Sequence, residues 1–115
     1  MPQAARLLDR IQVGGAVTDI ASVFSGARHI AIARSTQSTV EIDTVARTMY
    51  VTVGIDTLRK RDIGAEHGVQ LSATRARMSY SATGIGYGAA NLSVVVRRSS
   101  AVDTVFVSRL GRVRH

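Results

Sequence analysis

The apolar residues of this 115-residue chain change their spacing near residue 28. Before that point they recur three and four positions apart, as they do on one face of an amphipathic helix. Gly14 and Gly15 interrupt this pattern, and Ser25 and Gly26 end it, which predicts two short helices or one kinked helix. The residues that carry the helical spacing are Ala4, Leu7, Leu8 and Ile11, followed by Val17, Ile20, Ala21 and Phe24.

From His29 onward the apolar residues alternate with polar or small ones, which is the spacing of half-buried β-strands. The first predicted strands contain Ile30 and Ile32, then residues 40–43, and then residues 49–55, with a turn or a bulge at residues 44–47. A helix over residues 40–49 is the competing interpretation, but the Thr and Val content favours a strand. Residues 58–68 mix charges with two glycines and are predicted to form a loop.

The second half of the chain adds further strands to the prediction. Residues 69–82 keep one apolar face if a bulge near Thr74 bends a single strand. A glycine-rich turn at residues 81–91 then leads into a strand at residues 92–98. A last strand at residues 102–110 precedes a basic tail.

These elements predict the α+β class, with two short N-terminal helices packed on a mainly antiparallel sheet of five or six strands that can curl toward a barrel. A chain of this length buries roughly 65% of the surface that its unfolded form exposes, enough for one core. We therefore expect a single domain over residues 1–115, made of a helical segment (1–27), a β-rich segment (28–110) and the basic tail (111–115). The helices are expected to cover the sheet, and contact with a partner is the alternative.

All of the net charge lies in the second half of the chain. Residues 1–57 carry as many cations as anions, whereas residues 58–115 carry ten cations against Asp62, Glu66 and Asp103 and hold the whole net charge of +7. A one-sided excess of this size attracts polyanions and acidic surfaces. The cations predicted to bind nucleic acid are Arg59, Lys60, Arg61, Arg75, Arg77, Arg97, Arg98, Arg109, Arg112 and Arg114.

The pair Arg75 and Arg77 is central to this prediction. On one face of a strand these residues would lie beside the hydroxyl groups of Ser79 and Ser81, and guanidinium and hydroxyl groups together bind phosphate oxygens. Only five residues are aromatic, and Tyr80 is predicted to face the core, so we do not expect bases to stack on rings. The chain would then contact the backbone of RNA or DNA with little sequence selectivity. A solvated sheet face that keeps the protein soluble is the alternative.

No motif predicts a catalytic, cofactor or metal site. Gly84, Gly86 and Ala89 satisfy a loose G-x-G-x-x-A dinucleotide fingerprint, but the fingerprint requires a helix after it and a strand is predicted there. Asp62, Glu66 and His67 could hold a metal or carry out acid–base chemistry, but their spacing fits no helical metal motif and the flanking glycines indicate a surface turn. The chain contains no cysteine, which excludes disulfides and thiolate ligands.

The leading hypothesis is a non-enzymatic, homo-oligomeric nucleic-acid-binding protein, and an acidic protein surface is the other partner that the charge fits. The second hypothesis is a structural subunit of a homo-oligomeric assembly such as a phage particle, a shell or a secretion apparatus. A small β-rich enzyme or ligand carrier, with a pocket near Glu66, His67 or Tyr87, comes third. The first residues, MPQAARLLDRIQ, contain no uninterrupted apolar segment, and residues 78–96 are too polar to cross a membrane. We therefore expect a cytoplasmic protein without membrane contact.

Overall fold

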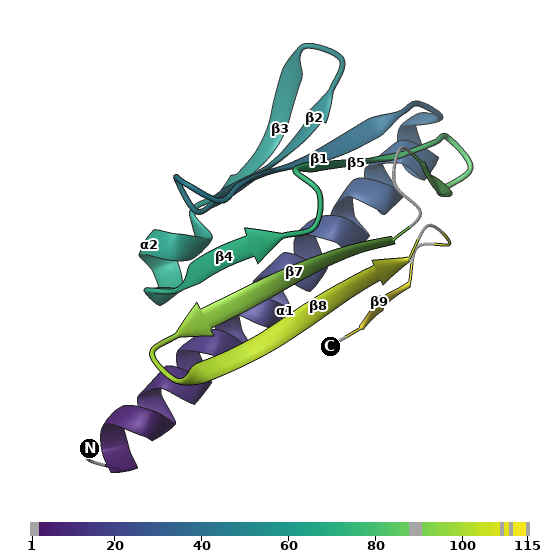
Figure 1. Ribbon diagram of the computed structural model, residues 1–115. Coiled ribbons are helices and arrows are strands. Elements are labelled where there is room, and N and C mark those ends of the chain that lie inside the picture. The colour runs from purple at the N-terminus through teal and green to yellow at the C-terminus, as the bar shows by residue number, and fades with distance from the viewer. Residues whose placement is uncertain (1–2, 88–90, 109, 111, 115) are drawn as a thin grey trace.

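A computed structural model describes residues 3–87, 91–108, 110 and 112–114 of the chain. One long helix, α1 (Gln3–Arg34), runs along two antiparallel β-sheets (Figure 1). The predicted α+β class is therefore confirmed, and so is the antiparallel pairing of the strands. The prediction of a single sheet is wrong, because the strands divide into two sheets that do not close into a barrel.

The N-terminal residues form one helix of 32 residues, so the prediction of two short helices is wrong. Gly14 and Gly15 do not break it, and the buried Val13 before them continues one apolar stripe with the buried Val17 and Ile20 after them. Gly15 lies against a second helix, α2 (Ile63–His67), and a Cβ atom at this position would lie 3.1 Å from the ring of His67. Glycine thus allows α2 to approach α1 closely. At about 1.5 Å per residue the helix is about 48 Å long, which accounts for the 50 Å long axis of the molecule.

The strand predicted at Ile30 and Ile32 is wrong, because both residues lie in the last turns of α1. Ala31 between them is fully buried while Ile32 is exposed, the reverse of what the alternation predicts. The helix ends in a Schellman motif, in which the amide of Thr36 donates to the carbonyl of Ala31 and the amide of Ser35 donates to the carbonyl of Ile32. Ser35 has a φ of 50°, in the left-handed region that glycine usually occupies at this position, so no glycine marks the end of the helix.

Five strands form the first sheet, sheet A, in the order β3-β2-β1-β5-β6. They are β1 (Ser38–Asp43), β2 (Thr48–Val53), β3 (Asp56–Arg61), β5 (Arg77–Tyr80) and β6 (Gly86–Tyr87). The carboxylate of Asp43 accepts hydrogen bonds from the amides of Val45 and Ala46, which closes the predicted turn between β1 and β2. The loop predicted over residues 58–68 is wrong, because this stretch holds most of β3 and the helix α2, which Asp62 caps.

The second sheet, sheet B, has the order β4-β7-β8-β9. Its strands are β4 (Gln70–Ala73), β7 (Asn91–Arg98), β8 (Ala101–Ser108) and β9 (Val113–Arg114). β7 and β8 confirm the last two predicted strands, and β9 lies within the predicted tail. The bent strand predicted over residues 69–82 is wrong, because its two halves are β4 in sheet B and β5 in sheet A. The residues between them cross from sheet to sheet, since Thr74 bonds to Ser93 of sheet B and the carbonyl of Ala76 accepts from Ile42 of sheet A.

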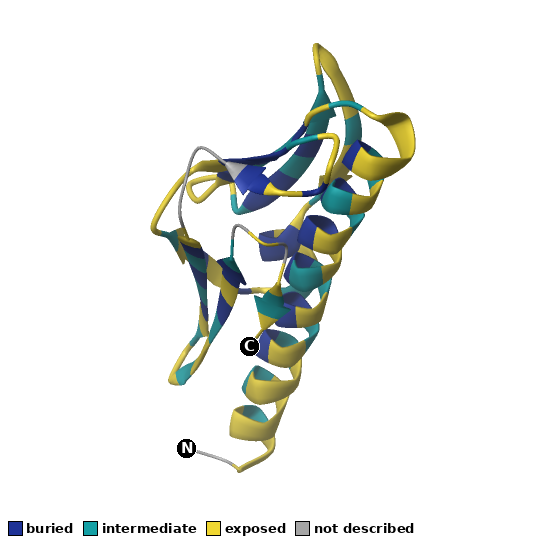
Figure 2. Ribbon diagram, turned by 90° about the vertical axis from the view of Figure 1, so that its right-hand side faces the viewer, coloured by how far each residue is buried: buried dark blue, intermediate teal, exposed yellow. Residues whose placement is uncertain are grey.

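The core lies between α1 and the two sheets, on one side of the helix (Figure 2). Phe24, Ile20 and Tyr80 are among its largest fully buried side chains, which confirms the prediction that Tyr80 faces the core. The N-terminal end of α1 extends past the sheets, and none of residues 3–12 is buried (Figure 2). We call residues 3–12 the projecting segment and residues 13–34 the packed segment of α1.

Candidate interaction surfaces

The projecting segment exposes three large apolar side chains. Leu7, Leu8 and Ile11 are 53%, 46% and 60% exposed. Ile11 lies three and four positions after the two leucines, so the three side chains are neighbours on the surface of the helix. Arg6 and Arg10 accompany them on this segment. Exposed apolar groups that lie together on a helix are a typical contact site for another protein.

Arg98 of β7 holds the projecting segment to the rest of the fold. Its Nε atom donates to Oδ1 of Asp9 at 2.8 Å, and both side chains are largely shielded from solvent. A second guanidinium nitrogen donates to the carbonyl of His67 at 3.0 Å. One guanidinium therefore links α1, α2 and β7, and charge-assisted hydrogen bonds of this kind fix direction as well as distance.

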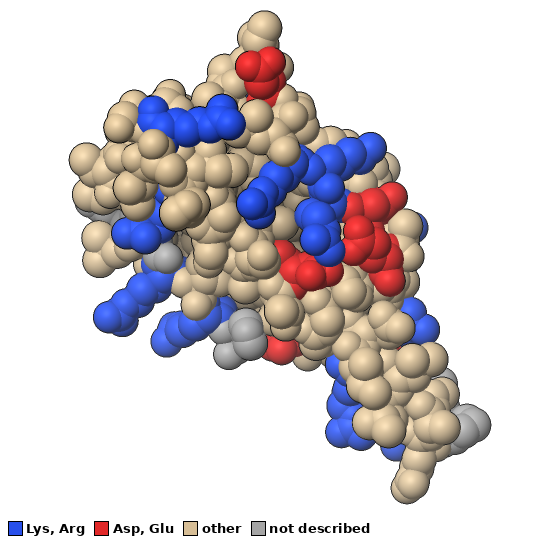
Figure 3. Space-filling view, turned by 180° about the vertical axis from the view of Figure 1, so that it is seen from behind, with Lys and Arg blue, Asp and Glu red and all other residues tan. Residues whose placement is uncertain are grey.

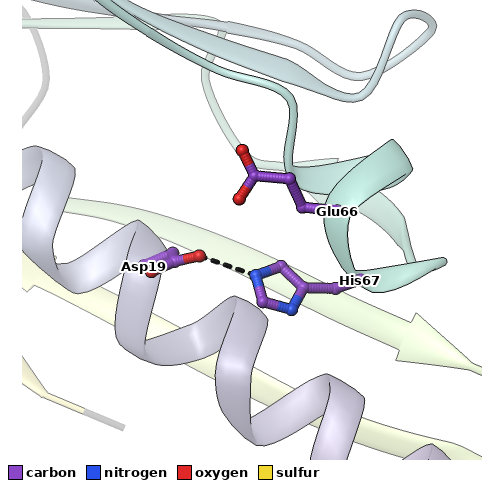
Figure 4. A group of neighbouring side chains, drawn as sticks. All are labelled: Asp19, Glu66 and His67. Atoms are coloured by element: carbon purple, nitrogen blue, oxygen red, sulfur yellow. Dashed lines mark hydrogen bonds and ion pairs between the residues drawn. The ribbon is translucent and has the colours of Figure 1, made fainter.

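A second polar cluster joins the middle of α1 to α2 (Figure 4). Oδ2 of Asp19 lies 2.6 Å from Nε2 of His67 and accepts a hydrogen bond from Arg61 at 2.8 Å. Arg61 also donates to Glu66 at 2.9 Å. The hydrogen bond to Glu66 and the charge of Asp19 raise the pKa of Arg61 above its ordinary value. The guanidinium thus stays charged and joins two carboxylates.

The same cluster contains potential metal ligands. Ligand atoms of Asp19, Glu66 and His67 lie within 4.8 Å of one another, the one such group among the residues that the structure describes. Arg61 bonds to both carboxylates and supplies a positive charge between them. A metal ion at this position would be repelled by the guanidinium. We therefore assign the cluster a structural role, which is to hold α2 against the packed segment of α1.

The cations predicted to bind nucleic acid are divided between the two sheets. Arg61, Arg77 and Arg98 form ion pairs with carboxylates of the same chain. On the face opposite to that of Figure 1, acidic and basic side chains lie next to one another (Figure 3). The cations of sheet A and its connections are Arg59, Lys60, Arg61, Arg75 and Arg77; those of sheet B are Arg97, Arg98, Arg112 and Arg114, and Arg109 lies outside the described residues.

The groups around Arg75 and Arg77 bond within the chain. Arg75 lies in the connection before β5, and Arg77 in β5 donates to Glu41 of β1 at 2.7 Å. Ser79 is buried, and its hydroxyl group lies 2.9 Å from that of Thr39. Arg77 and Ser79, two of the groups expected to bind phosphate, are therefore already bonded to side chains of β1.

Another set of side chains gathers on the face of sheet B that turns away from α1. β7 and β8 bury alternate side chains toward the helix and turn the others outward, among them Arg97 and Phe106. The guanidinium of Arg114 lies 5.6 Å from the centre of the Phe106 ring, at a distance typical of cation–π contacts. Arg112 and Arg114 line a groove of about 460 Å³ at the end of the sheet where β9 pairs with β8.

No protein-family model and no curated protein sequence matches the chain. Among solved structures, the type IV minor pilin FimU of Pseudomonas aeruginosa strain PAO1 aligns with a TM-score of 0.78 and 13% identity, over 94% of this chain and 90% of FimU. The chain has the fold of a minor pilin. A second crystal form of FimU gives a TM-score of 0.73 at 13% identity, over 88% of this chain and 90% of the other. The minor pseudopilin EpsH from the Type 2 Secretion System of Vibrio cholerae gives 0.68 at 11% identity, over 90% of this chain and 94% of EpsH.

This fold contradicts the predicted nucleic-acid-binding function and, with it, RNA or DNA as the partner. It also contradicts the cytoplasmic localisation, because FimU belongs to type IV pili and EpsH to a Type 2 Secretion System. The second hypothesis, a structural subunit of an assembly such as a secretion apparatus, is not contradicted by this fold. No helix of the described residues combines the length and the apolar character needed to cross a membrane.

Residues 81–85 of the glycine-rich segment form the turn between β5 and β6. Gly84 has a φ of 83° in this turn, Gly86 begins the strand β6, and the next described element is the strand β7. A dinucleotide fingerprint needs the N-terminus of a helix at that point. Ala89, the last residue of the pattern, lies outside the described residues, as does the side chain of Tyr87.

The sequence does not predict that Leu7, Leu8 and Ile11 are exposed. Their helical spacing identifies a shared face, but it does not reveal where the sheets that cover this face end. The pairing of Asp9 with Arg98 was equally hidden, because the two residues are 89 positions apart in the chain.

Proposed function

We propose that this chain is a structural subunit of a pilus-like or pseudopilus-like filament of the cell envelope. Its fold, shared with FimU and EpsH over 90% or more of each chain, supports this function. The observation that carries the proposal is the projecting segment, which exposes Leu7, Leu8 and Ile11 on a helix whose remaining length is packed. A subunit that binds its neighbours head to tail through such a segment forms an open helical array.

The three side chains can contribute to assembly without fixing it alone. Full burial of one leucine or isoleucine contributes roughly 1.5 to 3 kcal/mol, so covering the part of these three that is exposed adds roughly 2 to 5 kcal/mol. An isolated contact of this strength is weak, since even millimolar affinity corresponds to about 4 kcal/mol. Stable assembly through the projecting segment therefore requires several neighbours at once, as in a filament.

The direction of the projecting segment is fixed by the fold. Asp9 bonds to Arg98 of β7, and Asp19 bonds to Arg61 and His67. These contacts prevent α1 from rolling or sliding on the sheets, because each rotation would break a charge-assisted hydrogen bond. A filament subunit needs such rigidity, since small errors of direction accumulate along an array.

Photo-crosslinking in the native host tests the proposal. Leu7 or Ile11 is replaced by p-benzoylphenylalanine, and the cells are irradiated before the envelope and sheared surface fractions are collected. We expect adducts between the chain and other filament subunits in these fractions, identified by immunoblotting and mass spectrometry. Ile55, which is fully exposed in the turn between β2 and β3, is the matched control and should give fewer adducts.

A charge substitution gives the second half of the test. Leu7→Glu combined with Ile11→Glu should remove the chain from the sheared surface fraction, because neighbours would have to bury two carboxylates. The melting temperature of the purified variant should stay near that of the parent chain, since both positions are exposed. The proposed function would be refuted if the parent chain, like the variant, remained in the cytosol and formed no adducts.

A further inference from the structure

The outer face of sheet B is the side of β7 and β8 that turns away from α1 (Figure 1). It combines apolar and cationic side chains. Arg97 pairs in register with Val102, and Phe106 pairs with Arg114 of β9. Val102 and Phe106 are 50% and 46% exposed. Cations and exposed apolar groups therefore lie next to each other on this face.

None of the eight acidic residues, all of which the structure describes, lies on the outer face. Asp103 pairs in register with the buried Val96, so it belongs to the opposite face of β8. The other seven are Asp9, Asp19, Glu41 and Glu66 in ion pairs, Asp43 in the turn between β1 and β2, Asp62 at the N-terminus of α2, and Asp56 in sheet A. Within the described part of the chain, Arg97, Arg112 and Arg114 thus have no carboxylate partner at ion-pair distance.

The groove of about 460 Å³ at the β9 end of this face is large enough for a few side chains and too small for a folded domain. Phe106 offers an apolar wall, Arg112 and Arg114 offer positive charge, and Asn91 and Ser93 offer hydrogen-bonding groups. We propose that the groove and the outer face of sheet B bind an acidic, extended segment of a neighbouring protein subunit. This inference rests on the proposed function, which supplies the neighbour.

The spacing of the cations fits an extended chain. Arg97 and Arg114 lie on strands separated by β8 and are offset by four residues along it, as the register shows. Strand spacings of about 4.8 Å and a rise of about 3.3 Å per residue place their backbones roughly 16 Å apart. An extended segment of roughly five residues spans this distance. Acidic side chains near its two ends can then reach the arginines while an apolar side chain between them meets Phe106.

A protein segment fits this face better than a nucleic acid does. Phosphates follow one another at every nucleotide, whereas Arg97 is far from Arg112 and Arg114, and the exposed Val102 and Phe106 lie between them. The exposed ring of Phe106 is already covered in part by Arg114. A segment that alternates acidic and apolar residues matches both components of the face.

Fluorescence anisotropy with the purified full chain tests the inference. The probe is a labelled peptide that alternates Glu and Val around a central Phe. Comparison probes are the same peptide with Gln in place of Glu, and a single-stranded oligonucleotide of equal net charge. We expect the Gln peptide to bind at least about 10-fold more weakly, since a tenfold change corresponds to about 1.4 kcal/mol and two charge-assisted contacts are lost. The oligonucleotide should bind more weakly than the acidic peptide.

Two charge-reversal variants locate the binding site. Arg112→Glu combined with Arg114→Glu should weaken binding of the acidic peptide about 10-fold or more, and Phe106→Ala should weaken it about 3-fold. The matched control is Arg59→Glu combined with Arg75→Glu, which changes the net charge equally on exposed positions of sheet A and its connection. Binding to the control variant should stay within about 2-fold of the parent chain. Circular dichroism spectra verify that each variant is folded.

Each outcome decides for or against the inference. Equal losses in both double variants would show a general attraction of opposite charges and would overturn it, as would tighter binding of the oligonucleotide or equal binding of the Gln peptide. The crosslinks at Leu7 report the proposed function separately. Crosslinked assemblies without peptide binding refute this inference alone, whereas peptide binding without any envelope crosslinks refutes the filament function alone.

Discussion

The projecting and packed segments of α1 have similar apolar patterns and opposite environments. In the packed segment, Ile20 and Phe24 are fully buried beneath the sheets, whereas Leu7 and Ile11 of the projecting segment are more than half exposed. Nothing in the local spacing of apolar residues separates the two segments. The difference arises because the sheets are shorter than the helix. It teaches that helical periodicity identifies an apolar face, while the tertiary structure decides whether the subunit itself or a neighbour covers that face.

The strongest test of this contrast is a pair of truncations to alanine. Phe24→Ala should lower the free energy of unfolding by about 3 to 5 kcal/mol, because it removes a fully buried ring and leaves a cavity. Leu7→Ala should change it by less than about 0.5 kcal/mol in the isolated chain, because this side chain is exposed. Urea denaturation followed by circular dichroism measures both values. Similar losses in the two variants would mean that the projecting segment is packed in solution, and would remove the contrast.

Tyr80, a fully buried residue of the core, tests the energetics of the packed part of the molecule. Its hydroxyl group is buried and has no hydrogen-bond partner among the described residues. Tyr80→Phe should therefore raise the free energy of unfolding by about 1 kcal/mol at neutral pH, since it removes an unsatisfied polar group. Thermal denaturation of the two proteins measures the difference.

The same substitution has a pH dependence of known sign. Burial raises the pKa of Tyr80 from its ordinary value of 10.0 to about 12. The unfolded chain therefore loses this proton at lower pH than the folded chain, and the parent protein loses stability as pH rises from about 10 to about 12, by on the order of 2 kcal/mol. Tyr80→Phe should lack this loss. Tyr50→Phe, at a half-buried ring, is the control and should retain it.

The sequence predicts much of sheet A and sheet B but not their separation. Alternating apolar and polar residues predict four of the strands, because each has one buried face and one face that is more exposed: β1, β2, β7 and β8. β3 is missed because it is an edge strand with little buried surface, and charged residues such as Arg59 and Lys60 replace the alternation. The division between β4 and β5 depends on hydrogen bonds to two different sheets, and no local pattern contains that information.

The charge asymmetry shows a similar limit for the candidate sites. Arg61, Arg77 and Arg98 belong to the basic half of the chain, but the carboxylates that pair with them include Asp9, Asp19 and Glu41 from the neutral half. Net charge by segment therefore overstates the cationic surface, because folding brings distant acids to the arginines. The cations of the outer face of sheet B differ from them, because no carboxylate of the described residues pairs with Arg97, Arg112 or Arg114.

A smaller effect tests how the projecting segment is held. Asp9→Ala removes the ion pair with Arg98 and should lower the free energy of unfolding by roughly 1 kcal/mol, given the partial exposure of the pair. Amide hydrogens of the projecting segment should exchange faster than in the parent chain, while those of the packed segment should not. Asp56→Ala, at the exposed start of β3, is the control and should change neither quantity. Unchanged exchange in Asp9→Ala would mean that the segment keeps its direction without Arg98.

The smallest expected effect concerns the two glycines at the border between the segments. Gly14→Ala should raise the free energy of unfolding by up to about 1 kcal/mol, because alanine favours the helix and a Cβ atom there meets open space. Gly15→Ala should gain less or lose stability, because its Cβ atom would lie 3.1 Å from the ring of His67, which is held by a 2.6 Å hydrogen bond to Asp19. Urea denaturation of both variants gives the difference. A loss at both positions would indicate a break in α1 between the segments, whereas equal gains would show that His67 yields easily and that close approach of α2 does not require glycine at position 15.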